Sequence, residues 1–104
     1  MSEPELAHLR EEALRLVEDA LKKPPTELKS EVDDAERAVA ILRDAWIDHL
    51  RAQPTPWVRN NLDMTNVSLS LIVGLEYPMG GLQRDMLDQA RQALERVEVE
   101  PPDD

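Results

Sequence analysis

The sequence predicts an all-α fold, an antiparallel up-and-down four-helix bundle that is complete in one chain or completed by dimerisation. Apolar residues recur at three- and four-residue spacing in four segments, which prolines or glycines separate. Fifteen leucines, no phenylalanine and one tyrosine suit helix packing better than an aromatic-rich sheet. A length of 104 residues suffices for one core. We therefore expect residues 1–97 to form a single helical domain and residues 98–104 to form an acidic flexible tail.

The first helix is expected over residues 3–23. Ser2 and Glu5 have the spacing of a capping box, in which each side chain bonds a backbone N–H at the helix start. Pro24 and Pro25 then end the helix, because proline lacks an N–H and clashes with the preceding turn. The inward stripe is expected to contain Leu6, Leu9, Ala13, Leu16 and Ala20.

The second helix is expected to begin at Thr26 or Ser30 and to end near residue 52, before Pro54. Its apolar positions keep a heptad spacing, which favours a left-handed packing seam against a neighbouring helix. Trp46 lies on this seam and is expected in the core. The seam consists of Leu28, Val32, Ala35, Val39, Leu42, Trp46 and His49.

The third segment, residues 57–75, is apolar on two faces when wound as a helix. A helix of this kind must lie centrally in the fold or against a second chain. One face holds Val58, Leu62, Leu69, Ile72 and Val73, and the other holds Met64, Val67, Leu71 and Leu75. The polar stripe between them is Arg59, Asp63, Asn66 and Ser70, and Ser68 is interpreted as one more ordinary polar position.

Part of the third segment also fits a strand, because apolar and polar residues alternate over residues 67–71. We favour a helix, since a strand needs a partner and the other alternating stretch, residues 97–100, is short and followed by proline. Thr55 is the expected N-cap of this helix and Pro56 its first residue.

The fourth helix is expected over residues 82–97, after a glycine pair. We interpret Gly80 and Gly81 as a turn that requires positive φ rather than a phosphate-binding loop, because no lysine follows them at the helix start. The expected inward residues are Leu82, Met86, Ala90, Ala93, Leu94 and Val97.

Composition and charge restrict the partners and the compartment. The net charge of −10 repels nucleic acid and anionic lipid, so we expect no direct binding to either, and any charged partner should be basic. No apolar run approaches the roughly 20 residues of a membrane span, and the acidic N-terminal residues do not resemble a signal peptide. Without cysteine there is no support for an oxidising compartment. The expected location is the cytoplasm.

No combination of residues indicates catalysis or a cofactor. Glu5 and His8 have a metal-ligand spacing, but a di-iron bundle needs a second such pair and further inward glutamates, which the chain lacks. His49 is interpreted as a half-buried histidine near a helix end rather than a general base or a pH switch. We therefore expect a protein that is not an enzyme and that binds neither metal nor cofactor.

The predicted function is that of a small interaction or accessory protein whose apolar third helix binds a second copy, as a homodimer, or a helix of a partner protein. The alternative is an acidic inhibitor that imitates nucleic acid and occupies a basic protein. Its acidic row would consist of Glu31, Asp33, Asp34, Glu36, Asp44 and Asp48. The residues expected to contact a partner, by type and by position near loops or on the third helix, are Trp57, Met64, Val67, Leu71, Tyr77 and Met79.

Overall fold

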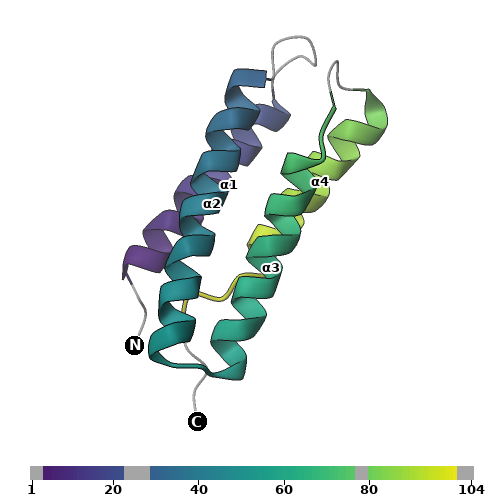
Figure 1. Ribbon diagram of the computed structural model, residues 1–104. Coiled ribbons are helices and arrows are strands. Elements are labelled where there is room, and N and C mark those ends of the chain that lie inside the picture. Colours follow the sequence, from purple (N-terminus) through teal and green to yellow (C-terminus); the bar gives the residue numbers. More distant parts are fainter. Residues whose placement is uncertain (1–3, 23–28, 77–79, 101–104) are drawn as a thin grey trace.

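The computed structural model describes residues 4–22, 29–76 and 80–100, which form four helices (Figure 1). These are α1 (Pro4–Leu21), α2 (Lys29–Ala52), α3 (Pro56–Val73) and α4 (Gly81–Glu95). The predicted all-α class is confirmed. The third segment is a helix and not a strand, and no strand occurs within the described ranges.

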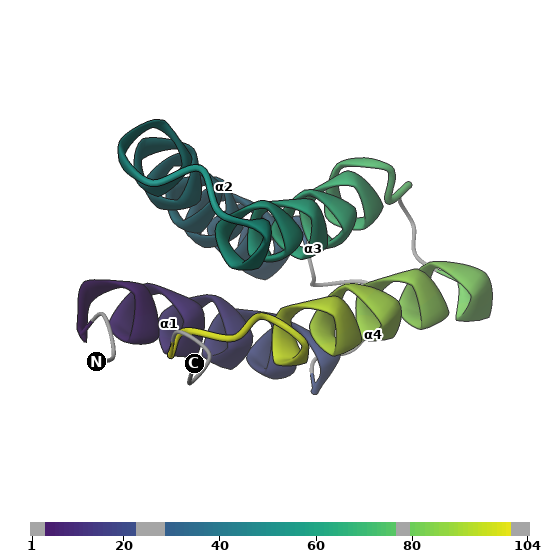
Figure 2. The same cartoon turned by 90° about the horizontal axis from the view of Figure 1, so that it is seen from below.

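The helices form an up-and-down bundle in which each helix lies beside the next in the sequence, and α4 returns to lie beside α1. Seen end-on, α2 and α3 make one layer and α1 and α4 make the other (Figure 2). Short connections between successive helices require this antiparallel order, because a chain cannot return to the starting end within a few residues. The bundle arrangement agrees with the prediction.

All four helices contribute buried residues to the core, and the seam of α2 is confirmed over its described length. His49 is half-buried at the end of the seam, and Leu28 lies outside the described residues. The Trp46 indole is fully buried and packs edge-to-face on Trp57, with ring centroids 5.3 Å apart. The buried seam residues are Val32, Ala35, Val39, Leu42 and Trp46.

Local capping explains where α3 begins. The Thr55 hydroxyl accepts a hydrogen bond from the Val58 N–H at 3.2 Å, and Pro56 occupies the first turn, as predicted. The start of α4 differs from the prediction. Gly80 is its N-cap with φ −96°, so the expectation of a turn with positive φ was wrong there, and no side chain caps this helix start.

Two arginine side chains connect α1 and α4 through hydrogen bonds to backbone carbonyl oxygens at the C-terminal end of the other helix. The Arg10 guanidinium donates to the carbonyl oxygens of Leu94 at 3.2 Å and Glu95 at 3.0 Å, where the last turn of α4 lacks partners within its own helix. At the opposite end, Arg84 donates to the carbonyl oxygen of Leu21. These bonds hold α4 antiparallel to α1 and close the bundle.

The chain after α4 continues against the first half of α3. Val97 is buried, Val99 is half-buried against the core, and the side chain of Asn61 bonds the backbone of Glu98. Of the expected flexible tail, residues 98–104, the first two residues are thus held by the domain through a hydrogen-bonded pair that no sequence periodicity indicates. Residues 101–104 lie outside the described part of the chain.

Candidate functional site

Helix α3 buries short polar side chains on the face that meets the rest of the bundle. Asn61, Thr65 and Ser68 are all buried, beside Val58, Leu69 and Ile72. Each polar group has a partner. The Thr65 hydroxyl donates to the Asn61 carbonyl oxygen at 2.8 Å, and the Ser68 hydroxyl donates to the Ala90 carbonyl oxygen of α4 at 2.9 Å. The interpretation of Ser68 as an ordinary polar position was therefore wrong, because a backbone acceptor on α4 satisfies it inside the core.

Because polar residues occupy these inward positions, apolar residues of α3 are turned toward the outside of the bundle. Met64 and Leu71 are half-buried, and Val67 is 45% exposed. They follow one another at three- and four-residue spacing and so form one stripe. An ordinary surface helix presents polar residues to water. In α3, an apolar stripe occupies part of this outward face.

The stripe lines a groove between α3 and α4, which we call the α3–α4 groove. It consists of two adjoining hollows of about 500 and 260 Å³, which share Val67, Leu71 and Gln89. Met86 and Ala93 complete its apolar wall on α4. The lining residues are Met64, Asn66, Val67, Ser70, Leu71, Met86, Gln89, Gln92, Ala93 and Arg96.

The α3–α4 groove is nearly free of charge. Among the described residues that line it, only Arg96 is charged, although a third of the chain is Asp, Glu, Lys or Arg and the net charge is −10. Leu82, one helical turn before Met86 on α4, is 72% exposed and extends the apolar stripe toward the start of the helix. The groove is therefore the place where this acidic surface is best suited to apolar contact.

Three of the six predicted contact residues, Met64, Val67 and Leu71, lie together in the α3–α4 groove. Trp57 packs on Trp46 at the start of α3 and does not line the groove. Tyr77 and Met79 lie outside the described residues.

Two residues of the third segment lie on faces other than those predicted. Val73 was assigned to the apolar face of Val58 and Ile72, both of which are buried. It is 61% exposed and lies beside Ala40 on the α2 side of α3. Leu75 was assigned to the second apolar face. It follows the end of α3 and is buried in the core.

Sequence reasoning also misjudged the inward face of α4. Leu82 and Met86 were expected inside, but Leu82 is exposed and Met86 lines the groove. Leu87 was not expected inside and is fully buried. The buried stripe was visible in the sequence, since Leu87, Ala90 and Leu94 also repeat at three- and four-residue spacing. A second apolar stripe on the same helix was chosen as the inward one instead.

Four of the six acids proposed for nucleic-acid mimicry form ion pairs along α2. Each of these four aspartates has a basic neighbour on its own helix, at nitrogen–oxygen distances between 3.1 and 3.9 Å. The chain of phosphates in a nucleic acid has no such built-in cations, and these pairs reduce the negative field along the helix. The pairs are Asp33 with Lys29, Asp34 with Arg37, Asp44 with Arg43, and Asp48 with Arg51.

The titratable groups with shifted pKa values lie in surface ion pairs. Hydrogen bonds from Arg91 and then Gln92 lower the pKa of the Asp88 carboxyl, and the hydrogen bond from Arg15 lowers that of Glu12. Neither carboxylate lines a groove described here. His8 is exposed, and the described residues contain no group of three or more His, Cys, Asp or Glu side chains placed to hold a metal ion.

Within the described ranges, no helix combines the length and the apolar character that a membrane span needs. Comparison of the chain with protein-family models, with curated proteins and with solved structures found no match. The function of this protein must therefore be inferred from the surfaces of the bundle.

Proposed function

We propose that this protein is a non-catalytic interaction module of the cytoplasm, which forms a homodimer through the α3–α4 groove. The observation that carries the proposal is the reversed pattern of α3, where Thr65 and Ser68 are buried and Val67 is exposed. Departures from the ordinary pattern of apolar inside and polar outside are expected at functional sites. Contact with a second apolar surface would remove the exposed part of this stripe from water.

The charge of the groove favours a second copy as the partner. In a two-fold interface the same patch meets itself, so that any carboxylate near the axis would face its own copy. The described lining of the groove contains no carboxylate. It contains the amides of Asn66, Gln89 and Gln92, and an amide carries both donors and an acceptor and can pair with its symmetry mate. Two chains that each carry −10 can approach through such a surface.

The nucleic-acid mimic is the less favoured reading, because four of its six proposed acidic residues are paired with cations on α2. The two functions respond differently to salt. Apolar association through the groove should persist as ionic strength rises, whereas a complex held by the α2 acids should weaken steeply.

The proposal is tested with two matched substitutions on α3, Val67→Glu and Val73→Glu. Both sites carry an exposed valine, but only Val67 lines the groove. A carboxylate desolvated in an apolar interface costs about 3 kcal/mol or more, so Val67→Glu should raise the dimer dissociation constant at least about a hundredfold. Val73→Glu should change it by less than about threefold, as surface substitutions usually do.

Sedimentation equilibrium gives the dissociation constants, and circular dichroism shows whether each variant keeps its helix content. Leu71→Glu, inside the same groove, should also dissociate the dimer. A wild-type chain that stays monomeric up to millimolar concentration would refute self-association. A dimer that Val67→Glu leaves intact would place the interface elsewhere.

A further inference from the structure

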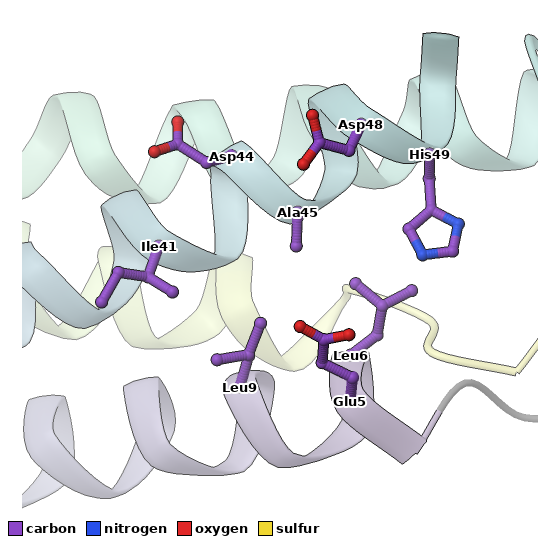
Figure 3. Close-up of a pocket in the computed structure, with 8 residues that line it drawn as sticks. All are labelled: Glu5, Leu6, Leu9, Ile41, Asp44, Ala45, Asp48 and His49. Carbon is purple, nitrogen blue, oxygen red and sulfur yellow. The ribbon is translucent and has the colours of Figure 1, made fainter. Parts of the chain in front are cut away.

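A second groove lies on another face of the bundle, between the first half of α1 and the second half of α2 (Figure 3). We call it the α1–α2 groove. It has a volume of about 280 Å³. Four apolar residues form its floor, three carboxylates stand along it and one histidine closes an end. These residues are Leu6, Leu9, Ile41 and Ala45, then Glu5, Asp44 and Asp48, and His49.

The floor of the groove exposes aliphatic surface. Ile41 is 49% exposed although it lies in the middle of α2, and Leu9 opposite it on α1 is half-buried. Figure 3 shows these two side chains together at one end of the groove. An aliphatic side chain placed between them would gain from the burial of both surfaces.

The carboxylates come from both walls. Glu5 belongs to α1, and Asp44 and Asp48 belong to α2, with Glu5 and Asp48 at the end nearest His49 (Figure 3). The described lining contains neither lysine nor arginine. Asp44 does pair with Arg43 at 3.1 Å and Asp48 with Arg51 at 3.9 Å. The two pairs reduce the negative field, but neither arginine lines the groove, so the carboxylates are the charged groups that a ligand in the groove would contact.

We propose that the α1–α2 groove docks a basic amphipathic segment of a partner protein. An aliphatic side chain of the segment lies on the floor beside Ile41 and Leu9, and a lysine or arginine lies between Glu5 and Asp48. Acidic residues around an apolar floor are complementary to a chain with the reverse arrangement of charge.

The probe is a fluorescein-labelled peptide of repeated Leu-Lys-Lys-Leu, with a Leu-Glu-Glu-Leu peptide as its matched control. Fluorescence anisotropy at physiological ionic strength measures binding to the full chain. The lysine peptide should bind, and the glutamate peptide should bind at least about tenfold more weakly because it meets like charges. Equal binding of the two peptides would overturn the proposal.

Long-range attraction to an acidic protein is separated from docking by a matched pair of variants. The first combines Asp44→Asn with Asp48→Asn, and the second combines Asp63→Asn with Asp85→Asn, two exposed aspartates on α3 and α4. Both variants change the net charge equally. Each groove carboxylate should account for about a twofold to fivefold change in affinity, so the first variant should bind about 4- to 25-fold more weakly. The control should change by less than about twofold.

The apolar floor is tested with Ile41→Ser against Val73→Ser, a somewhat more exposed aliphatic site outside the groove. Ile41→Ser should weaken peptide binding about threefold or more, and Val73→Ser should leave it unchanged. In the wild type, chemical-shift changes on adding the lysine peptide should centre on Ile41, Ala45 and His49. Equal weakening by the two aspartate variants, or shift changes centred outside the groove, would overturn the proposal.

This docking is independent of the proposed homodimer. Val67→Glu lies outside the α1–α2 groove, so a monomer made by that substitution should bind the lysine peptide as the wild type does. Failure of dimerisation and failure of peptide docking are therefore distinguishable in the same set of variants.

Discussion

Asn61 is expected to hold the end of the chain against α3. It is 3% exposed, and its side-chain amide donates to the Glu98 carbonyl oxygen at 2.8 Å while its Oδ1 accepts from the Glu98 N–H at 2.9 Å. Asn61→Ala removes both bonds at once. At about 0.5 to 1.5 kcal/mol for each, the free energy of unfolding should fall by about 1 to 3 kcal/mol. For a domain of this size each kcal/mol lowers the melting temperature by about 4 to 8 °C.

Asn61→Asp separates the two bonds. The new carboxylate still accepts from the Glu98 N–H, but it cannot donate to the Glu98 carbonyl oxygen and is buried beside it. Burial and the lost donor should raise the pKa of this carboxyl in the folded state above its ordinary value near 3.9. A raised pKa means that the folded state holds the proton better. The variant should therefore approach wild-type stability below about pH 4 and lose stability as pH rises through the raised pKa.

Urea unfolding followed by tryptophan fluorescence measures these differences, and amide hydrogen exchange reports the Glu98 N–H directly. Asn60→Ala is the matched control, since Asn60 lies on the same helix, is exposed and lines neither groove. Its effect should stay within about 0.5 kcal/mol. The reasoning would be refuted if Asn61→Ala cost no more than this control, or if exchange at Glu98 did not accelerate.

Three further predictions concern helix ends and a surface ion pair. Thr55→Ala should lower the free energy of unfolding by about 1 kcal/mol, because it removes the acceptor for the Val58 N–H, and an unchanged urea midpoint would contradict the capping role. Gly81→Ala should raise it by about 0.5 to 1 kcal/mol, since a Cβ there meets no atom within 4 Å and φ is not left-handed, so a lower melting temperature would count against it. Hydrogen bonds from Arg91 and then Gln92 lower the pKa of Asp88, so its contribution to stability is present above the ordinary value near 3.8 and is lost as pH falls through the lowered pKa. Asp88→Asn should therefore be less stable than the wild type at pH 7 and lose less stability on acidification, and an NMR titration of the wild-type carboxyl that showed an unshifted pKa would contradict this.

The candidate site could be predicted only in part. The stripe of Met64, Val67 and Leu71 was visible as a second apolar face, because its spacing is a local property of the chain. Its partner residues on α4 were assigned to the core instead. Met86 and Leu87 are adjacent and both apolar, and periodicity alone does not say which of two neighbouring stripes turns inward.

The number and order of the helices followed from the sequence by itself. Prolines stand between helices or in a first helical turn, Thr55 caps α3 through an atom three residues away, and apolar spacing marks each helix within its own segment. All of these interactions are local.

The tertiary structure alone decided which faces point inward. Ser68 is buried because a carbonyl oxygen 22 residues away accepts a hydrogen bond from its hydroxyl. Asn61 is buried because its side chain bonds the backbone of Glu98, 37 residues along the chain. A polar side chain can leave water when distant backbone groups satisfy it, and the positions of those groups exist only once the helices have packed. That packing buries polar residues of α3 and leaves its apolar stripe in the groove.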